Sequence, residues 1–227
     1  MRVWKRPAGL PRRFSVLLLG LFCYGFAIAM MVRAQLGVAP WDVLSLGIAH
    51  QTGWNFGIIT VGLSAVVLLL WIPLRQWPGI GTVLNSLLVG PAADLGLAII
   101  PNTTQLWVQL LYLFGGIALL AVATGLYIGA HFGPGPRDGL MTGLVRRTGW
   151  KIWIVRSLIE IVVLSIGWSL GGNVGIGTVL FAFGIGPLCN YTIPWLALTL
   201  RTTDPQLESE LEGSLPPSRE PGDSPAF

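Results

Sequence analysis

Long apolar stretches separated by short polar turns make up most of this chain. A helix needs roughly 20 apolar residues to cross a bilayer core about 30 Å thick. Six stretches are long enough: 14–33, 55–74, 79–100, 105–130, 152–171 and 175–200. Two further stretches, 38–50 and 134–147, have helical signals but hold only about 13 residues, too few to span. The pattern predicts an all-α polytopic membrane protein with about six transmembrane helices and two short helices.

The pattern occurs twice, at a constant offset of 96 residues and without a gap. LGVAPWDVLSLGIAHQTGW starts at Leu36, and FGPGPRDGLMTGLVRRTGW starts at Phe132. GIGTVL starts at Gly79 and again 96 residues later. Chance matches in apolar sequence are mostly Leu and Val, whereas these matches include Pro-x-Asp, Thr-Gly-Trp and Gly-Pro, the last at residues 90–91 and 186–187. We therefore predict two membrane repeats, 14–104 and 105–200, each with one long, one short and two long helices.

The few charged residues indicate how the repeats cross the membrane. Three spans per repeat give inverted repeats, and four give parallel ones. With three spans, the following basic residues fall on the side of the basic N-terminus, which is cytoplasmic by the positive-inside rule: Arg75, Arg146, Arg147, Lys151 and Arg201. Four spans would place Arg75 outside and force the short helices to cross. Length and charge therefore favour two inverted three-helix repeats, with both termini cytoplasmic.

The two ends of the chain differ from its apolar body. Residues 1–13 form a basic N-terminus, and residues 201–227 are rich in acidic residues and proline. The acidic residues of this second segment are Asp204, Glu208, Glu210, Glu212, Glu220 and Asp223. A segment with so few apolar side chains cannot offset its ordering entropy, so we expect a disordered acidic tail.

The short helices carry the candidate substrate-binding residues. GVAPWD and GPGPRD each place a proline at the first helical turn and an aspartate two residues later, which gives Pro40 and Asp42, then Pro136 and Asp138. In one interpretation the helices lie flat at the interface and the aspartates only cap them. In the other, they are re-entrant half-helices that meet near a pseudo-two-fold axis and form a transporter site. Such a carboxylate would suit a cation, a proton relay or a zwitterionic solute. Arg137 is added to the candidates because it replaces a tryptophan of the first copy.

Two other carboxylates at membrane depth are secondary candidates. Glu160 falls near mid-bilayer, and Arg156 precedes it by one helical turn, so the two could form a structural ion pair. Asp94 follows a Gly-Pro pair in the outer half of its span. Tryptophans fall near the predicted helix ends, as interfacial anchors do. They are Trp54, Trp71, Trp77, Trp107, Trp150, Trp153 and Trp195.

Composition narrows the class of protein further. The chain is 53% hydrophobic and 11% charged, against about 25% charged in an average soluble domain. That excludes an ordinary cytosolic enzyme or a nucleic-acid module. The sequence has no Walker motif, Rossmann fingerprint or H-E-x-x-H, and its two histidines are isolated. We therefore expect no enzymatic activity, cofactor, catalytic residue or metal. Cys23 and Cys189 lie in apolar spans, where packing roles are expected.

LGVAPWDVL, GTVLNSLLVGP, GPGPRDGLMTGL and GIGTVLFAFGIGP resemble the YczE/YitT-like integral membrane proteins of bacteria, over residues 14–200. The resemblance implies a multi-pass protein of the bacterial inner membrane whose molecular activity is generally unassigned. Together with the repeat, it leads to a small-solute or ion transporter as the expected function. The alternative is a non-transporting accessory or regulatory protein that acts through protein partners. The expected partners are the lipid bilayer and a small molecule or ion. The sequence does not decide whether the chain forms a homo-oligomer, and we expect no binding to nucleic acid.

Overall fold

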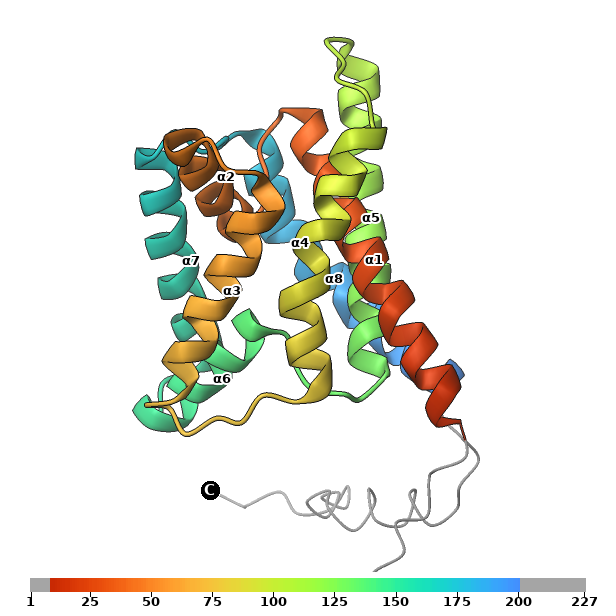
Figure 1. Ribbon diagram of the computed structural model, residues 1–227, viewed down its shortest axis with the longest axis vertical. Coiled ribbons are helices and arrows are strands. Elements are labelled where there is room, and N and C mark those ends of the chain that lie inside the picture. Colours follow the sequence, from red (N-terminus) through yellow and green to blue (C-terminus); the bar gives the residue numbers. More distant parts are fainter. Residues whose placement is uncertain (1–8, 201–227) are drawn as a thin grey trace, which may run out of the picture.

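The computed structural model describes residues 9–200, so residues 1–8 and the predicted acidic tail lie outside the described part. The described residues form α-helices and no strands, as the pattern predicts (Figure 1). The helices are α1 (Leu10–Ala34), α2 (Pro40–Thr52), α3 (Phe56–Trp71), α4 (Ile80–Ile99), α5 (Leu106–Gly129), α6 (Pro136–Thr148), α7 (Ile152–Ser169) and α8 (Ile176–Leu200).

Five helices, α1, α4, α5, α7 and α8, are long and apolar enough to cross a membrane. The predicted span 55–74 is too long, because the helix found there, α3, has 16 residues and ends at Trp71. Pro73 follows closely and has no N–H to donate, so the helix stops. The helices α2 and α3 join at a bend of 118° and together could make a sixth span. Large apolar side chains such as Leu69 and Phe183 are exposed on the outer faces, as expected for lipid contact.

Helix starts and stops follow the sequence signals closely. Pro40 and Pro136 begin the short helices, as predicted. Their ends are Gly53 and Gly149, both at φ 71° in the left-handed region that glycine adopts without strain. The helix α1 begins at Leu10 rather than 14, since Pro11 fits a first helical turn. The last residues of the predicted N-terminal segment 1–13 are therefore helical.

The sequence repeat is also a repeat of backbone conformation. Except for Gly9, every described residue with positive φ has a counterpart 96 positions away that also has positive φ. The pairs are Gln35 and His131, Gly37 and Gly133, Gly53 and Gly149, and Arg75 and Gly171. The same turns therefore connect the helices of both halves.

The two halves exchange hydrogen bonds at equivalent places. The Gly81 N–H at the start of α4 donates to the Phe132 carbonyl oxygen at 2.8 Å. The Gly177 N–H at the start of α8 donates to the Leu36 carbonyl oxygen at 2.7 Å. Each of these helices therefore begins against the loop that precedes the short helix of the other half.

The helices α1 and α5 pack along each other and run in opposite directions (Figure 1). Buried residues of both helices, such as Leu21, Met31 and Leu113, belong to the main hydrophobic cluster. The helix α4 packs on α1, and α8 packs on α5. The other helices form a second group in which α2 packs on α7 and α3 packs on α6. Figure 1 shows α2 and α6 at opposite ends of the molecule, called here the α2 end and the α6 end.

Candidate functional site

The short helices run from the surface into the interior. In α2, Pro40, Asp42 and Ser45 are buried, whereas the last residues before Gly53 are exposed. The helix α6 follows the same gradient, from a buried Pro136 to exposed arginines in its last turn. A helix lying flat at an interface would expose one face along its whole length. The observed burial instead favours half-helices whose N-terminal turns point inward.

The two buried N-terminal turns meet through side chains. Arg137 Nη2 donates to Asp42 Oδ1 at 3.2 Å, and the guanidinium carbon lies 5.3 Å from the centre of the Trp41 ring. Trp41 and Arg137 occupy equivalent positions of the two repeats, so duplicated positions contact each other. Asp42 is 1% exposed, and its Oδ2 has no hydrogen-bond partner among the described residues. Arg137 is therefore the group that compensates a deeply buried carboxylate.

The second aspartate has a different environment. The Tyr127 hydroxyl donates to Asp138 Oδ2 at 2.9 Å. Within residues 9–200, neither Asp42 nor Asp138 accepts a hydrogen bond from its own helix, so any capping by these carboxylates is electrostatic only. The N-terminus of α6 is held from outside, because Trp71 Nε1 donates to the Pro136 carbonyl oxygen at 3.1 Å. Trp71 is thus buried at the site and is not the interfacial anchor predicted from its position.

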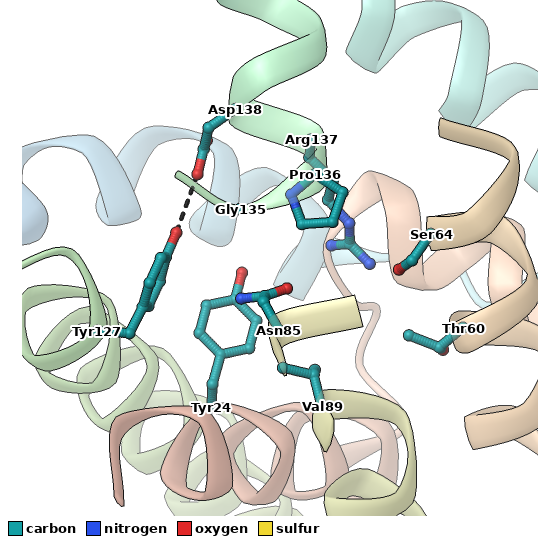
Figure 2. A pocket seen from close by; sticks show the side chains of 10 residues that line it. All are labelled: Tyr24, Thr60, Ser64, Asn85, Val89, Tyr127, Gly135, Pro136, Arg137 and Asp138. Carbon is teal, nitrogen blue, oxygen red and sulfur yellow. Dashed lines mark hydrogen bonds between the residues drawn. The ribbon is translucent and has the colours of Figure 1, made fainter. Parts of the chain in front are cut away.

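A cavity of about 50 Å³ lies in front of the first turn of α6 (Figure 2). Its polar lining comes from α1, α3, α4, α5 and α6, and consists of Tyr24, Thr60, Ser64, Asn85, Tyr127, Arg137 and Asp138. Tyr24, Ser64 and Asn85 make no side-chain hydrogen bond to any other described residue. A few water molecules or a small ion would fill the cavity and pair with these groups.

Sequence reasoning missed most of this lining. Tyr24 and Tyr127 lie in long apolar helices, where a polar group tends to face a cavity or a partner. That signal was present in the sequence, but it does not say which helices meet. Thr60 and Ser64 are small and occur on a helix that is apolar on every side, so their role depended on the fold.

The two secondary candidates lie outside this cavity. Asp94 Oδ1 accepts a hydrogen bond from the Gly57 N–H at 2.8 Å, so it satisfies the N-terminus of α3. Glu160 pairs with Arg156 at 3.0 Å on α7. The structure therefore brings together Asp42, Arg137, Asp138 and Pro136, whereas Asp94 and Glu160 belong to other places.

The central site combines one cation, two carboxylates and two helix N-termini. Each N-terminus carries a partial positive charge that roughly offsets half a carboxylate. In the described residues, no three of the side chains His, Cys, Asp and Glu are grouped to hold a metal ion. The arrangement offers separate positive and negative groups around a small space, as a polar solute or ion requires.

Comparisons with known proteins identify a family and several uncharacterized relatives. The model of a family of unknown function, DUF6198, matches residues 11–194. The chain is 39% identical to an uncharacterized protein of Haemophilus influenzae, over 82% of this chain and 85% of that protein. It is 29% identical to the uncharacterized membrane protein YczE of Bacillus subtilis, over 80% of this chain and 86% of that protein. No solved structure matches the chain. The predicted resemblance to YczE is confirmed, and the chain is a multi-pass membrane protein.

Proposed function

Since the chain belongs to the DUF6198 family, whose function is unknown, we propose its function from its structure: a membrane permease for a small solute or ion. The observation that carries the proposal is the Arg137–Asp42 contact between the buried N-terminal turns of α2 and α6. Paired, interrupted helices at matching positions of two halves typically form the binding site of secondary transporters. The solute would bind in the cavity beside this contact, and the proposal assigns no catalytic role.

The proposal includes an inverted arrangement of the two repeats in the inner membrane. Two features of the structure support this arrangement (Figure 1). The equivalent helices α1 and α5 run in opposite directions, and the equivalent short helices α2 and α6 lie at opposite ends of the molecule. The charges support it as well, because Arg146 and Arg147 close α6 whereas the matching turn of α2 has no lysine or arginine. With the positive-inside rule, the α6 end and both termini face the cytoplasm.

Flux through reconstituted liposomes tests the proposal. The purified protein is assayed with a panel of small zwitterions, cations and protons, because the site offers groups of both charges. Arg137→Gln should abolish the flux that the wild type supports, since it removes the only cation among the described residues that line the cavity. Arg75→Gln, at an exposed arginine outside the site, is the matched control and should keep it.

The alternative is a membrane accessory protein that acts through protein partners. It predicts no flux of any solute by a folded protein, and full activity of an Asp42→Asn/Asp138→Asn variant in the cell. That result, together with a stable co-purifying partner, would refute the permease.

A further inference from the structure

An ion pair lies on a helix that is long and apolar enough to cross the membrane. Arg156 Nε and Glu160 Oε1 are 3.0 Å apart on α7, and the two side chains are 49% and 28% exposed. Glu160 is the ninth of the 18 residues of the helix, so it lies about 12 Å from the helix start at a rise of 1.5 Å per residue. Charged groups at that depth are costly in lipid and almost always face water or a partner. This ion pair therefore needs a polar environment that lipid does not provide.

The repeat indicates which way the ion pair faces. The counterparts of Arg156 and Glu160, 96 positions earlier, are Thr60 and Ser64, and both line the central cavity. Leu164, one turn beyond Glu160 on the same helix row, packs against the main hydrophobic cluster. On α3 these positions line the cavity and carry hydroxyl groups, whereas on α7 they carry charges that are partly exposed.

The helices α3 and α4 meet along a closed seam, meaning that no space is left between their backbones near Gly57. Gly57 of α3 lies so close to α4 that an added Cβ would collide with the Gly90 carbonyl and the Asp94 carboxylate. The Gly57 N–H also donates to that carboxylate at 2.8 Å. The helices α3 and α4 are therefore in direct backbone contact.

The equivalent seam of the second half, between α7 and α8, is built differently. The counterparts of Gly57, Gly90 and Asp94 are Trp153, Gly186 and Asn190. A tryptophan cannot allow the close approach that a glycine does, and an added Cβ on Gly186 would meet nothing within 4 Å. Trp153 and Asn190 are exposed, and the described parts of α7 and α8 show no packing like that of α3 on α4.

We propose that water fills the space between α7 and α8, and that the Arg156–Glu160 pair lines this path from the α6 end to Asp138. Cys189 of α8 is half-buried, and we place it along this path. As the entry route of a solute, the path rests on the proposed permease. As a hydrated space, it can be tested without any solute. The closed seam of α3 and α4 is its counterpart on the α2 end.

The native Cys189 is the probe, in a Cys23→Ala background that leaves it as the single cysteine. The matched control is Ala93→Cys with both native cysteines removed, because residue 93 is the counterpart of 189 and is 0% exposed. Both proteins are treated with a hydrophilic, membrane-impermeant thiosulfonate in right-side-out and in everted membrane vesicles. Cys189 should react at least about tenfold faster than the control, because the reactive thiolate forms only in contact with water. The reaction should occur in everted vesicles and not in right-side-out ones.

A second variant tests the ion pair itself. Arg156→Leu/Glu160→Leu should lower the labelling rate of Cys189 by about tenfold, since an apolar wall would no longer hold water beside the thiol. Thermal unfolding in detergent checks that this variant is folded. Unchanged labelling in it would overturn the role of the pair.

Equal, slow labelling of Cys189 and of the control would overturn the path. Labelling by a lipid-soluble maleimide only would overturn it as well, because the thiol would then face lipid. Labelling without flux in liposomes would keep the path and refute the permease. Flux in liposomes without labelling of Cys189 would keep the permease and refute the path.

Discussion

Removal of Arg137 should destabilise the protein much more than removal of its partner. Asp42 is 1% exposed and one of its oxygens already has no hydrogen-bond partner in the described residues, so Arg137→Gln leaves a buried carboxylate without compensation. Such a loss typically costs about 3–5 kcal/mol. Asp42→Asn leaves Arg137, whose side chain is 27% exposed and can be hydrated, so it should cost only about 1 kcal/mol.

The double variant Arg137→Gln/Asp42→Asn distinguishes this account from a general loss of packing. It removes both charges, so it should be at least about 2 kcal/mol more stable than Arg137→Gln alone. Free energies of unfolding are measured by titration with a denaturing detergent, and Arg75→Gln should stay within about 0.5 kcal/mol of the wild type. If Asp42→Asn costs as much as Arg137→Gln, or if the double variant recovers nothing, the contact does not compensate the buried carboxylate.

Three further predictions concern other parts of the molecule. Gly57→Ala should lower the free energy of unfolding by about 1–3 kcal/mol, because the added methyl group pushes α3 away from α4. Gly62→Ala lies on the same helix, but its methyl group would meet nothing within 4 Å, so this variant should be as stable as the wild type or slightly more stable. Equal losses in the two variants would contradict the close contact of α3 and α4. Tyr127→Phe should lower the free energy of unfolding in detergent by about 1–3 kcal/mol, because it leaves Asp138 without its hydrogen-bond donor, whereas Tyr24→Phe, which loses no hydrogen bond to a described residue, should lower it less. The reverse order would contradict the assigned bond. Burial lowers the pKa of His131 below the usual histidine value of 6.5, and the nearby Arg13 lowers it further. As the pH falls below 6.5, this histidine is therefore protonated in the unfolded chain before it is protonated in the folded one, so the free energy of unfolding should fall. His131→Gln, which copies the glutamine of the first repeat, should remove that part of the dependence of the melting temperature between about pH 5 and pH 8; an unchanged slope would contradict it.

The repeated architecture was predictable because it depends on local signals. Proline at a first turn and glycine after a last turn set the ends of the short helices, and both signals occur twice. The length of α3 was not predictable from hydropathy, since apolar residues continue past Trp71 although Pro73 ends the helix.

The site was predictable only in part. Asp42, Arg137 and Asp138 share a sequence motif, and the structure brings their helix turns together. Their contacts depend on how the two halves pack, which no single segment encodes. Asp94 and Glu160 show the limit, because a helix that is apolar on nearly every side does not reveal which face points inward.

The crossed hydrogen bonds between the halves constrain the order of assembly. The start of α4 needs the carbonyl of Phe132, which is synthesised about fifty residues after Gly81. The carbonyl of Leu36 stays unpaired for longer, until Gly177 at the start of α8, the last helix, has been made. The first half is therefore inserted with open backbone groups and is completed only by the second. If the two halves are expressed as separate chains, each should accumulate only when the other is present, because each half supplies the carbonyl group that pairs with a helix N-terminus of the other.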